Sequence, residues 1–136
     1  MSGPNEYNQQ TIEQFRANGG KADYPGPLVL LTTIGAKSGQ PRTTPLAYSI
    51  AGDHLVIIAS AGGAPTHPDW YYNLVAHPIV TVELGSETFQ ARATVVEGAE
   101  RDRLYAQHAL VLGFSESDYR QKTTRQIPVI ILTRMD

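Results

Sequence analysis

The sequence predicts a mostly β protein of the α+β class, in which two or three helices pack outside about six mainly antiparallel strands. Short runs of branched apolar residues alternate with turn residues, and these runs cluster with short links between them. That order favours an antiparallel barrel or sheet over a doubly wound parallel sheet. The length of 136 residues fits one compact domain, with residues 1–26 as an N-terminal helix or extension and residues 27–136 as the main part.

The first half of the chain is expected to hold one helix and three strands. Residues 6–17 are predicted to form the helix, with Ile12 and Phe15 on one side, and a frayed polar terminus is the alternative. Residues 28–33, 42–50 and 54–60 are strand-like runs separated by turn residues. Short links of this kind predict an antiparallel meander.

The second half is expected to hold two helices and three further strands. Pro68 fits the first position of a short helix that His77-Pro78 ends. Residues 79–84 and 88–96 predict a hairpin, residues 115–123 a helical turn or loop, and residues 127–133 the last strand. The helix predicted over residues 98–113 places Leu104, His108 and Val111 on one face, so His108 is expected to be a packed core residue.

Composition excludes several classes of function. The net charge of −2 gives no indication of a nucleic-acid partner, and the four histidines lack metal-site spacing. The chain has no cysteine, which excludes disulfides and thiolate chemistry, and its apolar runs are too short to span a bilayer. We expect a cytoplasmic protein without a metal, and peripheral contact with the inner face of the membrane stays open, as does the choice between monomer and homodimer.

The stretch T-I-G-A-K-S-G-Q-P-R-T-T-P-L, residues 33–46, carries the features of an anion site. A glycine-containing hairpin tip exposes backbone N–H groups, Lys37 and Arg42 flank it, and no Asp or Glu occurs between residues 24 and 52. Fixed N–H donors, hydroxyls and cations together suit a phosphate or carboxylate. The alternative is an ordinary surface turn with two solvated cations, and the phosphate-loop motif is absent because Ala36 precedes Lys37.

Two further segments are candidates for a pocket that holds a flat ring. In Ala59-Ser60-Ala61-Gly62-Gly63, the paired glycines allow the backbone to approach a ring closely. Trp70 and Asn73 share one face of the short helix, and Trp70 is the only tryptophan. The alternatives are a flexible connection for the first segment, and for the second a core tryptophan with Asn73 as a cap-type partner.

A tyrosine among cations, Tyr119 in residues 118–128, is placed to line a substrate mouth, and a solvated helix end is the alternative. The sequence contains neither H-E-x-x-H nor G-x-S-x-G. Zinc-protease and serine-hydrolase chemistry are therefore not predicted.

Taken together, these stretches resemble the deazaflavin-dependent nitroreductase family, split β-barrel reductases with an FMN-binding-like fold that use coenzyme F420. The matching text runs in order from about residue 27 to the C-terminus: L-L-T-T-I-G-A-K-S-G-Q-P-R-T-T-P-L, I-I-A-S-A-G-G-A-P-T-H-P-D-W-Y-Y-N-L, H-P-I-V-T-V-E-L and Y-R-Q-K-T-T-R-Q-I-P-V-I-I-L. The resemblance implies an F420H2-dependent reductase that transfers a hydride from reduced deazaflavin to quinones, enones or nitroaromatics.

The resemblance also implies a role for each matching segment. The hairpin tip would hold the phosphate and glutamate tail of F420, the next strand would follow the tail and ring, and the glycine segment and short helix would contact the ring. The implied cofactor-binding residues are Ala36, Lys37, Ser38, Arg42, Thr43, Thr44, Pro45, Leu46, Ile58, Ala59, Ser60, Ala61, Gly62, Gly63, Asp69, Trp70, Tyr71, Tyr72 and Asn73. Ser60 and Tyr119 are the candidates for the catalytic proton donor.

Two departures from the family pattern leave the substrate range open, including bicyclic nitroimidazoles. Ala61 stands where the A-S-K-G-G form of the segment has lysine, and residues 113–119 contain one tyrosine where studied members carry several. Neither departure touches the cofactor clamp. The alternative functions are an FMN-dependent reductase on the same barrel, and a non-catalytic carrier of a cofactor or lipid-like anion.

Overall fold

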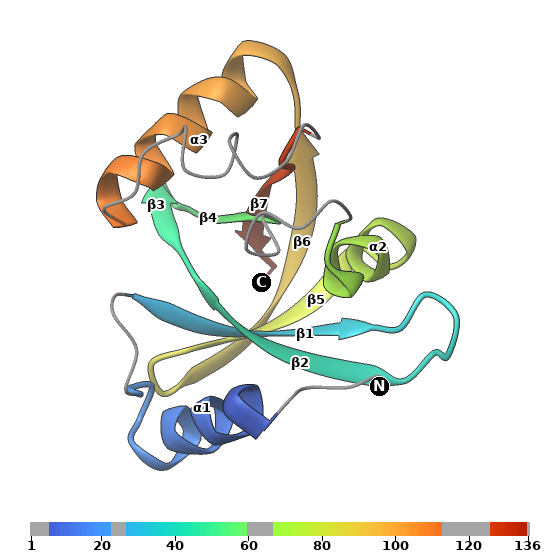
Figure 1. Cartoon of the computed structure of the whole chain (residues 1–136), viewed down its shortest axis with the longest axis vertical. Helices are drawn as coiled ribbons and strands as arrows, with labels where there is room; N and C mark the ends of the chain where they lie inside the picture. The colour runs from blue at the N-terminus through green and yellow to red at the C-terminus, as the bar shows by residue number, and fades with distance from the viewer. Residues whose placement is uncertain (1–5, 23–26, 60–66, 113–125, 136) are drawn as a thin grey trace.

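The computed structural model describes residues 6–22, 27–59, 67–112 and 126–135 (Figure 1). These residues form a single curled sheet with the strand order β2-β1-β5-β6-β7-β4-β3, in which every neighbouring pair is antiparallel. The elements are α1 (Glu6–Ala17), β1 (Leu28–Ile34), β2 (Pro41–Ala47), β3 (Ser49–Ala51), β4 (His54–Ile58), α2 (Asp69–Ala76), β5 (Ile79–Leu84), β6 (Glu87–Val96), α3 (Gly98–Leu112) and β7 (Val129–Arg134). The predicted α+β class with an antiparallel, barrel-like sheet is confirmed.

The sheet curls because its two outermost strands are consecutive in the chain. The single strand predicted over residues 42–50 is wrong, since the chain divides at Tyr48 into β2 and β3. β2 pairs with β1, whereas β3 pairs with β4 at the other end of the sheet (Figure 1). The predicted neighbours are right, but the strand pattern continues through the bend and so cannot reveal that the chain changes partners there.

The core lies inside the curled sheet, and one helix contributes to it. Alternate residues of β1, β4 and β7 point inward, and Trp70 and Leu74 of α2 pack against them. The inward residues of these three strands are Val29, Leu31, Leu55, Ile57, Ile130 and Leu132. The residues between them are buried as well, or partly buried in the case of Ile131, because helices cover the outer face, and this explains why the strands read as continuous apolar runs.

The N-terminal helix α1 packs on the outer face of β1, which confirms the predicted helix over a frayed terminus. Ile12 and Phe15 are buried against Leu28 and Leu30. Arg16 adds a two-pronged ion pair with Glu83 of β5, with nitrogen–oxygen distances of 2.8 and 3.0 Å. α1 is therefore attached to the sheet by apolar packing at its centre and an ion pair at its end.

Helix α3 covers the other end of the sheet and buries a histidine, as predicted. His108 is 1% exposed, and its Nδ1 lies 2.7 Å from the Ser49 hydroxyl oxygen of β3. Leu104 is also buried, whereas Val111 is 61% exposed, so its predicted place on the buried face is wrong. Sequence periodicity predicts the direction of a side chain around the helix axis. It does not predict how far along the helix the sheet extends, and so it could not show that Val111 is left exposed.

Pro68 is the N-cap of α2 and not its first helical residue. Residues 115–123 lie outside the described part of the chain. None of the helices in the described residues combines the length and apolar character needed to cross a membrane.

Burial of His108 predicts a loss of stability in mild acid. Burial lowers the pKa of His108 from 6.5 to about 4, so the folded protein keeps the ring neutral where the unfolded chain protonates it. The free energy of unfolding should therefore fall between pH 6.5 and pH 4, by about 2 kcal/mol between pH 7 and pH 5 from this group. Urea unfolding at both pH values measures the loss, and His108→Gln, which does not titrate, should lose correspondingly less. Equal losses in the two proteins would contradict the assignment.

Candidate functional site

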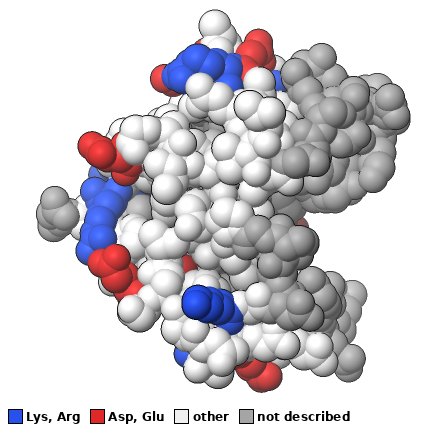
Figure 2. Space-filling view, turned by 90° about the vertical axis from the view of Figure 1, so that its left-hand side faces the viewer, with Lys and Arg blue, Asp and Glu red and all other residues white. Residues whose placement is uncertain are grey.

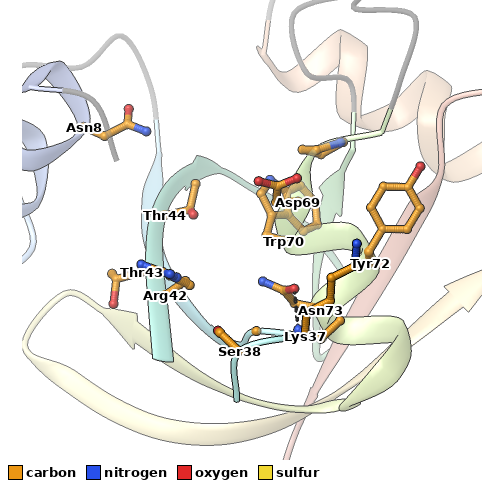
Figure 3. A pocket seen from close by; sticks show the side chains of 13 residues that line it. Asn8, Lys37, Ser38, Arg42, Thr43, Thr44, Asp69, Trp70, Tyr72 and Asn73 are labelled. Carbon is orange, nitrogen blue, oxygen red and sulfur yellow. Dashed lines mark hydrogen bonds between the residues drawn. The ribbon is translucent and has the colours of Figure 1, made fainter. Parts of the chain in front are cut away.

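One pocket of about 920 Å³ lies between the tip of the β1–β2 hairpin and the first two turns of α2 (Figure 3). Its volume is in the range of sites that bind small organic molecules. The hairpin provides polar and cationic side chains, and the helix provides aromatic rings and an amide. The lining residues are Asn8, Gly35, Ala36, Lys37, Ser38, Arg42, Thr43, Thr44, Pro68, Asp69, Trp70, Tyr72 and Asn73.

The hairpin tip is held in shape by its own hydrogen bonds. Gly35 N–H donates to the Gln40 carbonyl (2.8 Å), and Gly39 N–H donates to the Gly35 carbonyl (2.9 Å). Gln40 N–H donates to the Ser38 hydroxyl (3.2 Å), so this oxygen is already engaged in the turn. Among the described residues, the backbone N–H groups of Lys37 and Ser38 have no partner. The tip thus presents two neighbouring free donors beside a lysine, which suits an anion.

The two cations of the pocket are not neutralised by the described part of the protein. Lys37 and Arg42 are exposed, and neither forms an ion pair with another described residue. Figure 3 shows Arg42 and Thr44 directed from β2 toward the pocket, while Asp69 stands on the α2 side. The strand alternation explains this direction, because Leu46 on the same side of β2 packs into the inward core.

Several cations elsewhere in the described part of the chain have acidic neighbours. Figure 2 shows Lys or Arg and Asp or Glu side by side along one edge and at the top of a face that is otherwise mostly uncharged. Arg134 lies 3.2 Å from Glu87, and Arg103 lies 4.0 Å from Glu100. The pocket cations are therefore left to attract a ligand, whereas Arg103 and Arg134 are compensated by their acidic neighbours.

Helix α2 forms the aromatic wall of the pocket. Trp70 is 7% exposed, belongs to the core and also lines the pocket. Tyr72 lines the pocket and is 48% exposed, and its ring contacts His67 and Tyr71 at centroid distances of 5.8 and 5.6 Å. Trp70 is therefore a core residue that also lines this pocket, and its contact with a ring ligand stays a prediction.

Asn73 joins the helix to the hairpin. Its side-chain oxygen accepts the Ala36 N–H at 2.9 Å, and its side-chain nitrogen donates to the Thr33 hydroxyl at 3.1 Å. The residue is 8% exposed, and the first of these bonds is drawn in Figure 3. Asn73 thus makes a backbone contact of the kind expected from the alternative in which it is a cap-type partner. The backbone N–H that it accepts belongs to the hairpin and not to its own helix.

The structure brings together two of the segments singled out in the sequence, the hairpin tip and the short helix. Ten of the predicted cofactor-binding residues line the pocket: Ala36, Lys37, Ser38, Arg42, Thr43, Thr44, Asp69, Trp70, Tyr72 and Asn73. Ser60, Ala61, Gly62, Gly63 and Tyr119 lie outside the described residues.

Other predicted residues lie away from the pocket. Strand alternation places Pro45 on the outer face of the sheet, the side on which the hydroxyl of the pocket-lining Thr43 bonds to that of Thr32 (2.8 Å). Ile58 packs toward the cluster under α3, and Ala59 N–H donates to the Pro128 carbonyl (3.0 Å). Leu46 and Tyr71 pack against the inward core.

Three lining residues were not predicted from the sequence. Gly35 lies within the predicted segment 33–46 and Pro68 at the start of the predicted short helix, but neither was named as a binding residue, and their pocket contact follows from the backbone path of the hairpin and the helix start. Asn8 comes from α1, whose pattern indicates only which side is apolar. No local signal could have placed its amide beside a strand and helix that follow much later in the chain.

The comparison with known families gives the pocket a context. A family model described as F420H(2)-dependent quinone reductase matches residues 7–134. The chain belongs to this family. It is also 39% identical over 128 residues to an F420H(2)-dependent quinone reductase of Mycobacterium tuberculosis, covering 88% of this chain and 85% of the relative. The resemblance to deazaflavin-dependent reductases is thereby confirmed, and the matching family is named for quinones.

Two solved structures agree with the fold and the family. One, titled an F420-H2 dependent reductase, is 38% identical with a TM-score of 0.69, over 78% of this chain and 93% of its own. Another, titled a domain-swapped dimer, is 34% identical with a TM-score of 0.72, over 91% and 92% of the two chains. The predicted split-barrel architecture is therefore confirmed.

Proposed function

We propose that this protein is an F420H2-dependent reductase that binds F420 in the pocket between the β1–β2 hairpin and α2 and reduces quinones. The observation that carries the proposal is the pairing of an uncompensated cationic tip with an aromatic helix wall across one pocket. Membership of the quinone reductase family supports F420 as the cofactor and a quinone as the acceptor.

The residues present fit this cofactor. F420 has a flat tricyclic head and a tail that carries a phosphate and glutamates. Lys37, Arg42 and the free N–H groups of the tip would hold the anionic tail. Trp70 would lie beside the flat head, because an indole wall suits a ring system of similar shape.

The protein's contribution to the reaction is binding and orientation. Reduced F420 supplies a hydride when it is bound, so the chain needs no strong general base. The tip fixes one end of the cofactor and the α2 wall fixes the other, which limits its freedom before the acceptor arrives. The buried Trp70 ring keeps water from its side of the pocket.

The proton donors, the further acceptors, the location and the oligomeric state also belong to the proposal. Ser60 and Tyr119 are the proposed proton donors, and enones and nitroaromatics are proposed as further acceptors. The protein is proposed to act in the cytoplasm as a monomer or a homodimer. The relative titled a domain-swapped dimer supports the homodimer.

Turnover with reduced F420 and menadione tests the proposed activity. F420 is fluorescent when oxidised, so fluorescence should return in proportion to menadione consumed, and only when protein is present. An FMN-dependent reductase would instead retain yellow flavin on purification and turn over with reduced FMN. A carrier would bind reduced F420 without catalysing its oxidation by menadione, and either result would contradict the proposal.

Removal of either pocket cation should weaken cofactor binding. Lys37→Ala and Arg42→Ala should each reduce the binding free energy of F420 by about 1.5–3 kcal/mol, because a charge-assisted contact is lost. Lys21→Ala is the matched control, since this exposed lysine makes the same charge change away from the pocket. Fluorescence titration at low and high salt gives the affinities. Losses as large in Lys21→Ala would show that net charge, and not the pocket, attracts the cofactor.

A further inference from the structure

We propose that Asn73 is a positioning residue that sets the cationic tip for the cofactor tail and does not itself bind the cofactor. This inference rests on the proposed function and adds a role that differs from the direct contact implied by the resemblance. It follows from the two partners of the Asn73 amide and from their neighbours along the hairpin.

The amide contacts the hairpin at two points, and each point adjoins one pocket cation. Its oxygen accepts the N–H of Ala36, the residue immediately before Lys37. Its nitrogen donates to the hydroxyl of Thr33, which is the cross-strand partner of Arg42 in the β1–β2 register. One side chain of α2 therefore contacts the hairpin beside both pocket cations, through the backbone of Ala36 and through the side chain of Thr33.

The geometry leaves the amide little opportunity to contact a ligand. Each of its polar atoms already makes one hydrogen bond to the hairpin, at 2.9 and 3.1 Å, and although the residue lines the pocket it is only 8% exposed. The Thr33 side chain that receives one of the bonds is fully buried. A bound cofactor would meet the tip that Asn73 holds, and not the amide itself.

A fixed tip matters because binding a flexible one would require it to be ordered at the same time. The tip's internal bonds fix its shape, but among the described hydrogen bonds only those of Asn73 join it and adjoining β1 to α2. Without this link, Lys37 and its free N–H group would be ordered only when the tail binds, which lowers affinity. The effect should be confined to ligands that have the anionic tail.

The test compares two ligands in four proteins. The ligands are F420 and its tail-less deazaflavin chromophore, which lacks the phosphate and glutamates. The proteins are the wild type, Asn73→Ala, Thr33→Val and Leu74→Ala. Leu74 is the adjacent core residue of α2, so its truncation destabilises the same helix and leaves the amide in place. Fluorescence titration gives each affinity, and thermal unfolding gives each melting temperature.

Asn73→Ala should lose roughly tenfold in affinity for F420 and keep its affinity for the chromophore, so the preference for the tail falls. Thr33→Val should show a smaller loss of the same kind, and it decides the matter if Asn73→Ala does not fold. Leu74→Ala should melt at a lower temperature but keep the wild-type preference.

Three results would overturn the inference. Equal losses for both ligands in Asn73→Ala would indicate direct contact with the ring, and an unchanged preference in both Asn73→Ala and Thr33→Val would remove any role in placing the tip. A preference that falls equally in Leu74→Ala would show that helix stability alone is responsible. A wild type without preference for the tail would instead contradict the proposed function, because the cationic tip would then not bind the tail.

Discussion

The link between α2 and the β1–β2 hairpin is the constraint on which the pocket depends. The hairpin tip projects beyond the sheet, and α2 follows a separate strand, so nothing in the chain order brings them together. Two hydrogen bonds of Asn73, one buried and one partly buried, and the packing of Trp70 and Leu74 into the core hold them face to face. Breaking one such buried bond typically destabilises a protein by about 1–3 kcal/mol, and here it would also shift one wall of the pocket.

The curled sheet makes this arrangement possible. Because β2 continues into β3 through Tyr48, one length of chain spans both ends of the sheet and bends it around the core. Helices α1 and α3 cover the outer face, while α2 packs into the inward core and faces the hairpin tip. The buried Ser49–His108 pair between β3 and α3 therefore lies apart from the cations at the open tip.

Much of the fold could be predicted because strand and helix periodicities are local properties of the chain. The hairpin tip and α2 were both identified, since glycines, cations and a helix start leave clear signals. The break at Tyr48 was not predicted, because partner exchange depends on distant strands. Nor could the sequence show that the Thr43 hydroxyl faces outward, that Asn8 reaches the pocket or that the Asn73 amide is used twice. These depend on the three-dimensional packing of elements far apart in the chain.

A crystal structure of the protein with oxidised F420 tests the central claim most directly. The account predicts the phosphate within hydrogen-bonding distance of Lys37, Arg42 or the free N–H groups of the tip, with the ring beside Trp70. Asn73 should keep its bonds to Ala36 and Thr33 in the complex. Density for the cofactor at another surface, or for its ring at the tip and its tail in solvent, would contradict the account.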